Sequence, residues 1–291
     1  MMTAKDNLEV AEKALNVAKE GSGFIEKLLS ASPTYRANKL LLDEIEHDPN
    51  MNPMEKYVIM RNLNKIKKEI MNNANIYNIA NSMLSGKGKS LEKLLPTVDD
   101  EWLGMYDDIS KNVSNQDMQT VWAKILASKC EDENSISKKL LQVLQVMNSK
   151  DAEYFSYLCS HSVMCFNPAD KENSPIFLYP DVTKDELEVY DDKYINYDYL
   201  TNCSSLGLIN YNSSVGTILY KKADLLIMNY YGEKINIISS DGEIRIGVVT
   251  YTSCGEELVK ILHEGMSDKK DPLLISKISE YYKKNGYHVE E

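Results

Sequence analysis

Three residues of one acidic segment have the side-chain types that a metal-dependent nuclease uses. Asp181 follows Pro180, and Asp191 and Lys193 lie further along the same segment. Two carboxylates can hold Mg²⁺ while a lysine stabilises negative charge on the substrate. This chemistry requires the groups at adjacent strand ends, and the segment shows little of the alternation of a strand. Asp181, Asp191 and Lys193 therefore define an alternative metal site, next to the simpler interpretation of a solvated acidic loop.

Cys159, His161 and Cys165 form a second group of typical metal ligands. On one helix the side chains of Cys159 and His161 would point about 200° apart, so they cannot bind the same ion. The five cysteines include no Cys-x-x-Cys pair, and the four histidines lie in no recognisable arrangement with a Ser or Cys nucleophile. We therefore expect reduced, mostly buried thiols, no catalytic residues and no cofactor.

The tripeptide Gly88-Lys89-Ser90 resembles the end of a phosphate-binding P-loop. That loop needs an earlier glycine where this chain has Met83, and it follows a strand, whereas the preceding pattern here is helical. Nucleotide binding at this position is therefore disfavoured.

One predicted helix carries a basic stripe. Asn52 and Pro53 mark its start, as the cap and the first helical residue. Its apolar face is formed by Ile59, Leu63, Ile66 and Ile70, and its opposite, basic face by Arg61, Lys65 and Lys68. A basic face can bind an anionic partner, nucleic acid or lipid headgroups, although such faces are more often simply solvated. Arg61, Lys65 and Lys68 are therefore candidate binding residues.

The segments on either side of this helix are also expected to be mainly helical. Residues 15–30 are short and amphipathic, and could contact a membrane surface or a partner helix, although their short apolar face favours packing on their own domain. After the basic helix, a further helix is expected over residues 76–84, followed by a flexible linker, residues 85–90.

Residues 99–166 predict four successive helices. The second has a capping-box pattern at Ser114 and Asp117, the third follows Ser137, and the fourth is capped by Ser149 and runs to Val163. Trp122 lies on the apolar face of the second helix. Stripes of this kind form a hydrophobic core and do not form a cofactor site.

After Phe166 the sequence changes character. Residues 167–181 contain three prolines and predict a loop, which the acidic segment follows. Asp241 and Gly242 predict a hairpin turn between two strands, and Ser253 with Glu256 predicts another capping box. The remaining expected elements are a helix at 196–206, strands at 208–211, 225–230, 234–238 and 244–251, and helices from 253 and at 272–285.

These patterns predict an α+β protein of three regions. A mainly helical N-terminal region covers residues 1–98, a central helical core covers 99–166, and an acidic, winged-helix-like α/β domain covers 167–291. Residues 1–150 carry 20 Lys and Arg against 21 Asp and Glu, but residues 151–291 carry 13 against 23. Such an acidic half is a poor generic binder of nucleic acid. No apolar run reaches the length of a membrane span and no signal peptide is recognisable, so a cytoplasmic protein is expected.

The central block resembles a known bacterial family. Asp117–Ala127 reads Asp-Met-Gln-x-x-Trp-Ala-Lys-Ile-Leu-Ala, Leu141–Leu144 reads Leu-x-Val-Leu, and Ser149–Phe155 reads Ser-Lys-Asp-Ala-Glu-x-Phe. These motifs resemble domain-of-unknown-function family 2806, and the layout is similar to that of the abortive-infection alpha family of phage-defence proteins. Leu206–Ile209 and Thr252–Leu258 resemble shorter motifs of both families. Residues 130–139 lack the Pro-Gly turn and the Arg that members often carry there.

The resemblance implies a prokaryotic or phage-borne accessory protein, and it supplies no catalytic residues. We therefore expect a non-enzymatic protein of phage defence or counter-defence that acts through a protein partner or as a homo-oligomer. One alternative is a nuclease or nucleic-acid-binding effector that uses the acidic segment, although a nucleic-acid partner is not favoured. Another is an abortive-infection effector that acts on a membrane surface through residues 15–30.

Overall fold

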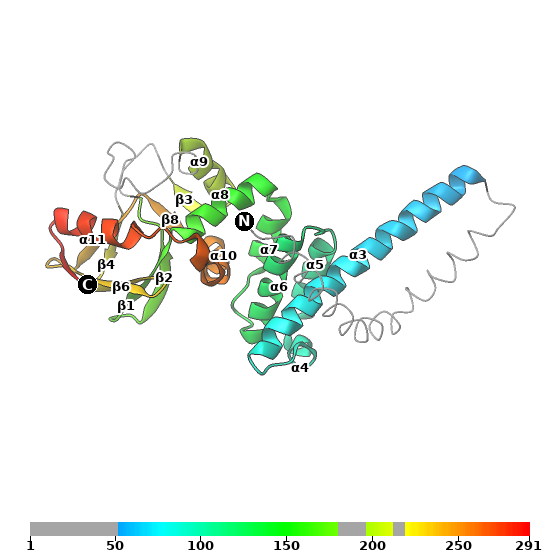
Figure 1. Ribbon diagram of the computed structural model, residues 1–291, viewed down its shortest axis with the longest axis horizontal. Coiled ribbons are helices and arrows are strands. Elements are labelled where there is room, and N and C mark those ends of the chain that lie inside the picture. The colour runs from blue at the N-terminus through cyan, green and yellow to red at the C-terminus, as the bar shows by residue number, and fades with distance from the viewer. Residues whose placement is uncertain (1–51, 180–195, 212–218) are drawn as a thin grey trace, which may run out of the picture. The chain divides into compact units, whose positions relative to one another are not determined.

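The computed structural model describes residues 52–179, 196–211 and 219–291, and the chain divides into two compact units, residues 1–130 and 131–291 (Figure 1). The described part of unit 1 is helical, and unit 2 combines helices with strands. The predicted α+β class, with a helical N-terminal and central region and a C-terminal sheet region, is confirmed. The boundary between the units falls inside the predicted central region, at the end of its second helix. The described elements of unit 1 are α3 (Pro53–Gly86), α4 (Leu91–Leu94), the 3₁₀ helix η1 (Leu95–Thr97), α5 (Asp100–Ser110) and α6 (Gln116–Glu131).

The helix α3 is longer than the sequence predicts. It continues through residues 71–75, where a break between two helices was expected, and through Ser85 and Gly86 of the predicted linker. The asparagines of residues 71–75 are weak helix formers, but the side chains of Asn72 and Asn73 bond to α5 and the loop after it, so tertiary contacts override the local preference. Because α3 precedes Gly88-Lys89-Ser90 directly, the strand that a P-loop requires is absent from this position.

Aromatic side chains form the centre of unit 1. Trp102 and Tyr106 of α5 stack with ring centroids 5.2 Å apart, and Tyr106 meets Trp122 of α6 edge-on at 5.4 Å. The Tyr106 hydroxyl donates a hydrogen bond of 2.7 Å to the carbonyl oxygen of Trp122. All three residues are at most 2% exposed, so the conspicuous tryptophan of the family motif is a core residue, as its helical spacing predicts.

Unit 2 contains helices α7–α11 and all nine strands of the described residues. Its helices are α7 (Lys138–Val146), α8 (Ser149–Ser160), α9 (Tyr197–Ser205), α10 (Ser253–His263), the 3₁₀ helix η2 (Glu264–Lys269) and α11 (Leu274–Lys284). Its strands are β1 (Val163–Asn167), β2 (Glu172–Ile176), β3 (Ile209–Tyr211), β4 (Leu219–Lys222), β5 (Leu225–Tyr230), β6 (Glu233–Ile238), β7 (Glu243–Gly247), β8 (Val249–Tyr251) and β9 (His288–Glu290).

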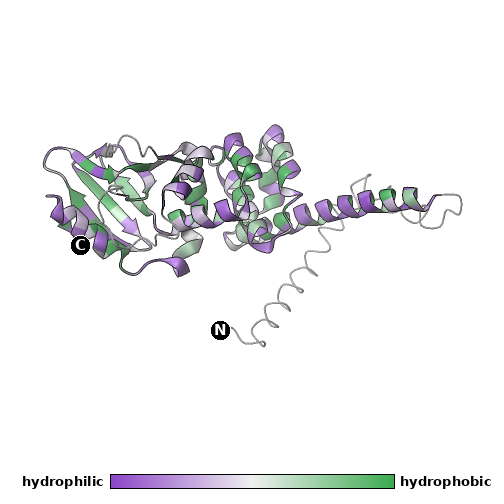
Figure 2. Ribbon diagram, turned by 90° about the horizontal axis from the view of Figure 1, so that it is seen from above, coloured by the Kyte–Doolittle hydropathy of each residue, from purple (hydrophilic) through white to green (hydrophobic). Residues whose placement is uncertain are grey.

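The main sheet is antiparallel, in the order β2-β1-β5-β6-β9. Hydrophobic and hydrophilic residues both occur along its strands (Figure 2). The buried side chains of this sheet pack against α11, which contributes Leu274, Ile275, Ile278, Tyr281 and Tyr282 to the same core. The strands β3 and β8 form a second pair, and β4 and β7 a third. The α/β nature of the region is therefore established, and the winged-helix layout stays a prediction.

Two strands replace structure that the sequence predicts differently. The expected fourth central helix ends at Ser160, and Val163 begins β1. The expected loop after residue 167 contains β2, which is an edge strand of the sheet. An edge strand tolerates a proline such as Pro175, because one side of its backbone needs no partner.

The turn at Asp241 and Gly242 is present, but it does not close a hairpin. It connects β6, which pairs with β5 and β9, to β7, which pairs with β4. Gly242 has a φ of +77° there, and the Asp241 carboxylate accepts a 2.6 Å hydrogen bond from the Ser239 hydroxyl. The turn sequence fixes a local reversal of the chain, but it does not choose the partners of the strands on either side.

The two short family motifs of unit 2 lie against each other. The Thr252 hydroxyl donates to the carbonyl oxygen of Gly207 at 2.6 Å and also accepts from the backbone N–H of Gly255. The Thr252 N–H donates to the Leu208 carbonyl at 3.0 Å. A Cβ at Gly255 would lie 1.9 Å from that same carbonyl oxygen, so only glycine permits this approach. The motifs therefore form a joint between the start of α10 and the end of α9.

Candidate interaction surface on helix α3

The N-terminal half of α3 presents one continuous exposed face of apolar and basic side chains. Met54, Tyr57 and Val58 are 67%, 62% and 48% exposed. At about 100° per residue, these three positions fall in the same stripe of the helix as the basic residues, on the side away from the predicted apolar face. We call this stripe the α3 face, and it consists of Met54, Tyr57, Val58, Arg61, Lys65 and Lys68.

The start of α3 is fixed by its own side chains. The Asn52 side chain accepts from the Met54 N–H at 2.9 Å, and the Glu55 carboxylate accepts from the Asn52 N–H at 3.3 Å, which completes a capping box. Pro53 occupies the first helical position, as the sequence predicts. Met54 and Tyr57 are therefore held within the first turns of a formed helix.

The basic residues are placed as predicted, because Arg61, Lys65 and Lys68 are all exposed along α3. The Lys65 Nζ lies 3.7 Å from the Glu69 Oε1, and the Lys65 side chain is 71% exposed. An exposed pair of this kind contributes at most about 1 kcal/mol, so Lys65 can exchange this partner for another at little cost. Sequence reasoning missed Met54, Tyr57 and Val58, although the helical period counted back from Arg61 places them on the same face.

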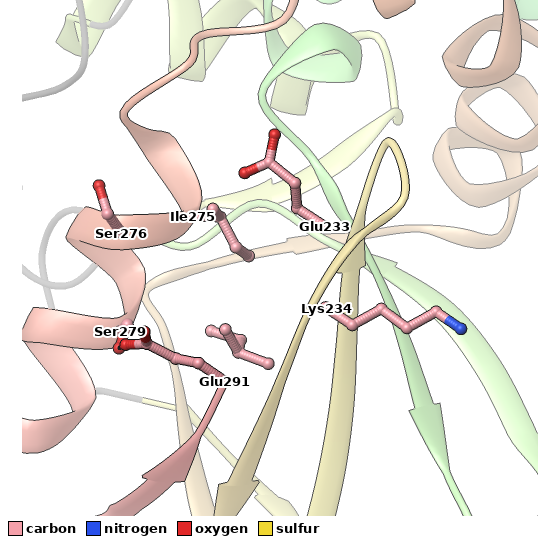
Figure 3. Close-up of a pocket in the computed structure, with 7 residues that line it drawn as sticks. Glu233, Lys234, Ile275, Ser276, Ser279 and Glu291 are labelled. Atoms are coloured by element: carbon pink, nitrogen blue, oxygen red, sulfur yellow. Dashed lines mark hydrogen bonds between the residues drawn. The ribbon is translucent and has the colours of Figure 1, made fainter.

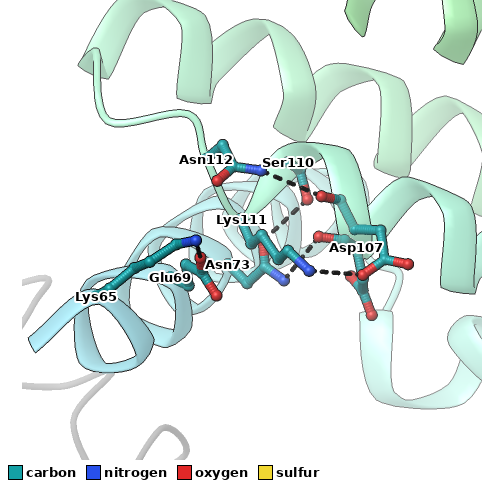
Figure 4. Close-up of polar contacts among 8 residues, drawn as sticks. Lys65, Glu69, Asn73, Asp107, Ser110, Lys111 and Asn112 are labelled. Atoms are coloured by element: carbon teal, nitrogen blue, oxygen red, sulfur yellow. Dashed lines mark hydrogen bonds and ion pairs between the residues drawn. The ribbon is translucent and has the colours of Figure 1, made fainter. Parts of the chain in front are cut away.

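A network of polar side chains anchors the C-terminal half of α3 to α5. Asn73 donates to the Asp107 carbonyl at 3.4 Å and accepts from the Ser110 hydroxyl at 2.9 Å (Figure 4). The Tyr77 hydroxyl donates to the Asp107 carboxylate at 2.9 Å. The buried Asn72 side chain donates to the Lys111 carbonyl at 2.8 Å. Hydrogen bonds of fixed geometry at the base of the helix hold it to the unit, which keeps the exposed half in a defined direction relative to α5.

Asp107 is the carboxyl group of this network, and its pKa is shifted from the ordinary value. Burial raises the pKa of its carboxyl group, and the hydrogen bond from Tyr77 opposes that rise without cancelling it. Burial, with the neighbouring Asp107 charge, also raises the pKa of Tyr77. Tyr77 therefore stays protonated and serves as the donor of the pair.

The raised pKa predicts how unit 1 responds to pH. Between the unfolded and the folded pKa of Asp107, the folded state binds the additional proton, so the free energy of unfolding rises as the pH falls through this window. Replacing Asp107 with asparagine keeps an acceptor for Tyr77 but removes the titration. We expect Asp107→Asn to lose this pH dependence and to be at least as stable as the parent protein at neutral pH.

Urea unfolding from about pH 4 to about pH 8, followed by tryptophan fluorescence, measures this effect, because both tryptophans lie in unit 1. Asp108→Asn is the matched control, because the Asp108 side chain is 76% exposed and its charge raises the Asp107 pKa less than burial does, so its removal should narrow the Asp107 window without abolishing it. An Asp107→Asn variant with the parent's dependence in this window would contradict the assignment.

The other predicted sites fall partly outside the described residues. Asp181, Asp191 and Lys193 and the membrane candidate, residues 15–30, lie outside the described residues. Cys159 is fully buried, and burial raises its pKa. All five cysteines are free and buried, so the predicted burial of the thiols is confirmed. Within residues 52–179, 196–211 and 219–291, no three His, Cys, Asp or Glu side chains gather to hold a metal ion. No helix in those ranges is long and apolar enough to cross a membrane.

Comparison with known proteins places the chain in a family. The sequence profile of DUF2806, described as "Protein of unknown function", matches residues 58–270, which is more than half of the 291 residues. No curated protein and no solved structure matches the chain. The matched range contains the Trp122 helix and the joint between Leu208 and Gly255. The chain therefore belongs to the DUF2806 family.

Proposed function

We propose that the protein is a non-enzymatic accessory factor of phage–host conflict, in defence or counter-defence, whose α3 face binds a protein partner. The observation that carries this proposal is the exposure of Met54, Tyr57 and Val58 beside Arg61. Methionine, tyrosine and arginine are enriched where proteins bind one another, and apolar residues clustered on an exposed surface mark interaction sites.

The basic residues of the α3 face indicate the chemistry of the partner. Three cations follow the apolar cluster along a helix, in a protein whose net charge is -11. A partner segment with apolar anchors and nearby carboxylates would match both parts of the face. The phage–host setting rests on the resemblance to the abortive-infection alpha family.

A nucleic-acid partner is the second candidate, because Arg61, Lys65 and Lys68 could contact phosphates and a winged-helix-like layout is common among DNA readers. Three exposed apolar side chains on the same face favour protein over nucleic acid. Two further hypotheses remain as alternatives. A nuclease that uses Asp181, Asp191 and Lys193 is tested by replacing these three residues, and an unchanged phenotype would exclude it. A membrane effector that uses residues 15–30 is tested by sedimentation with anionic liposomes, and a failure to sediment would count against it.

The proposal predicts that a change confined to the α3 face alters a phage phenotype. We expect the triple variant Met54→Ser, Tyr57→Ser, Val58→Ser to lose the effect of the parent protein on the plating efficiency of a phage panel. The matched control is Val146→Ser with Leu273→Ser, which removes exposed apolar side chains, 67% and 58% exposed, from unit 2. Equal expression and melting temperature of all variants exclude a folding defect.

Photocrosslinking identifies the partner class. A benzophenone side chain at position 57 should give a discrete protein adduct in infected cells, and the same group at position 146 should not. Adducts with nucleic acid alone at position 57 would replace the leading proposal with the second candidate. A phage panel unaffected by the parent protein would overturn the phage–host setting.

A further inference from the structure

The α3 face has a definite length. From Met54 to Lys68 it extends over about 21 Å, at a rise of about 1.5 Å per residue. Asn72 lies on the same line, about five helical turns after Met54, but it is only 7% exposed. Its side chain donates to the Lys111 carbonyl at 2.8 Å and to the Ser114 hydroxyl at 3.4 Å. The loop after α5 therefore covers the line of the α3 face beyond Lys68.

The apolar and basic side chains of this face are separated along its length. Met54, Tyr57 and Val58 occupy the first turns of α3, and the cations begin at Arg61 and end at Lys68, next to the covered part of the helix. A partner that matches the whole face must therefore carry its apolar and its acidic groups in separate turns.

The backbone of α3 limits the kind of segment that can cover this face. Beyond the first turn its N–H groups bond within the helix, so the face offers a partner side chains alone. An extended segment lying there would bury one side of its backbone without hydrogen-bond partners. A helix satisfies its own backbone groups, and side chains that repeat every three or four residues pack between those of a second helix at a crossing angle of about 20°.

Electrostatics then sets the direction of the partner helix. Carboxylates are favourable in the first turn of a helix, because they lie at the positive end of its macrodipole. In an antiparallel pair the first turns of the partner lie beside Lys65 and Lys68, so the same carboxylates stabilise the partner helix and pair with α3. In a parallel pair the carboxylates would have to lie at the C-terminal end of the partner, where the macrodipole opposes them.

We propose that the α3 face binds an amphipathic helix of about four turns that runs antiparallel to α3, with Asp or Glu in its first turns and apolar anchors in its last turns. The acidic turns lie beside the three cations of the α3 face, and the anchors pack on Tyr57 and its apolar neighbours. This inference rests on the proposed function and specifies the form of the partner segment.

A hollow of about 300 Å³ in unit 2, between β6 and α11, is a second place where an apolar side chain can bind (Figure 3). The carboxylates of Glu233 and Glu291 line it, and each already binds a lysine Nζ at 2.7 Å. Acidic turns beside them would bring like charges together, so the hollow does not match the whole partner helix. Ser276→Tyr fills the hollow from an exposed position of α11 and serves as a control.

The experiment uses the full chain and, as the probe, the designed peptide acetyl-Ser-Glu-Ala-Ala-Glu-Ala-Gln-Ala-Glu-Ala-Ala-Leu-Leu-Ala-Gln-Leu-amide. Its glutamates and leucines have the spacing of the α3 face in the antiparallel direction. Fluorescence anisotropy should show binding, and circular dichroism should show a gain of helix. The same peptide with proline between Gln and the third Glu cannot form this helix, and should bind more weakly by about tenfold or more.

Spin labels on the peptide test its direction on the ¹⁵N-labelled protein. A nitroxide at the C-terminus of the peptide should broaden the amide resonances near Met54, and a nitroxide at its N-terminus should broaden those near Lys68. The opposite pattern would overturn the antiparallel arrangement.

Charge reversal tests the pairing between the two helices. Arg61→Glu combined with Lys65→Glu should weaken binding of the acidic peptide by about tenfold or more. A peptide with lysines in place of its three glutamates should bind this double variant better than it binds the parent protein. Ser276→Tyr should bind the acidic peptide as tightly as the parent does.

Two results would overturn the helical partner. One is a parent protein that does not bind the acidic peptide or that binds the proline peptide equally well. The other is a parent protein that self-associates and becomes monomeric on Arg61→Glu, because the occupant of the face is then a second copy of the chain.

These outcomes are separate from the test of the proposed function. A protein adduct at position 57 in infected cells, together with no peptide binding, would remove the helical partner and leave the proposed function standing. Peptide binding without any protein adduct would remove the proposed function and leave the preference of the α3 face for an acidic helix.

Discussion

Replacing Gly255 with alanine is expected to lower the free energy of unfolding of unit 2 by about 3 kcal/mol or more. The new Cβ would lie 1.9 Å from the Leu208 carbonyl oxygen and 3.0 Å from the Tyr251 ring. Neither α10 nor the Leu208 backbone can retreat without losing the bonds that Thr252 makes to Gly207 and Leu208. A loss of this size is a large part of the stability of an ordinary domain.

The matched control is the same substitution at Gly104, in the interior of α5. There a Cβ meets no atom within 4 Å, and the backbone is helical. Gly104→Ala should therefore stabilise unit 1 by about 0.5–1 kcal/mol, because alanine loses less conformational freedom than glycine on forming a helix. Urea unfolding followed by far-UV circular dichroism compares both variants with the parent. The two substitutions are expected to change the free energy of unfolding in opposite directions. If Gly255→Ala left the free energy of unfolding unchanged, the joint between α9 and α10 would be more open than described.

Truncating Trp122 to alanine should have the largest effect on unit 1, a loss of about 3–5 kcal/mol in the free energy of unfolding. The indole is 2% exposed and meets the Tyr106 ring edge-on, so its removal leaves a cavity and takes away a favourable aromatic contact. The Tyr106 hydrogen bond to the backbone of residue 122 survives the substitution, so the loss reports mainly the side chain.

Fluorescence of the remaining Trp102 during urea unfolding measures this loss directly. Met71→Ala is the control within the same unit, because Met71 is 52% exposed on α3 and alanine favours a helix. Its change should stay within about 0.5 kcal/mol of the parent. If Trp122→Ala were equally mild, the interpretation of the family motif as the core of unit 1 would be wrong.

Helix existence was predictable in this chain, but helix ends were less so. The sequence predicts caps at Ser114, Ser149 and Ser253, whereas the side chains that cap are those of Asn115, Asn148 and Thr252, the first one residue later and the others one residue earlier. Each of these neighbours is itself a good capping residue, so the local pattern does not decide between them. The tertiary contacts of the following helix make that choice.

The strands were harder to predict because their partners are distant in sequence. Val163 continues an apolar helical spacing from α8, yet it begins a strand that pairs with β5 more than 60 residues later. Pro175 resembles a loop residue until β2 is known to lie at the edge. Short apolar runs are ambiguous between helix and strand, and only the sheet resolves the ambiguity.

The basic half of the α3 face was predictable from the sequence, and its apolar half was not. Arg61, Lys65 and Lys68 share a helical period that the sequence shows directly. The exposure of Met54, Tyr57 and Val58 depends on what the rest of the unit leaves uncovered. That property is not encoded in a local pattern.

The five buried cysteines can report when the structure around them opens. Cys130 lies in unit 1, and Cys159, Cys165, Cys203 and Cys254 lie in unit 2. With no disulfide to constrain it, each thiol becomes reactive when the structure around it opens, and burial raises the pKa of the four thiols in unit 2, which suppresses the reactive thiolate further. The rate at which a thiol reagent modifies each cysteine under native conditions therefore measures how often the structure around that cysteine opens. Cys130 reports on unit 1 and the other four cysteines report on unit 2.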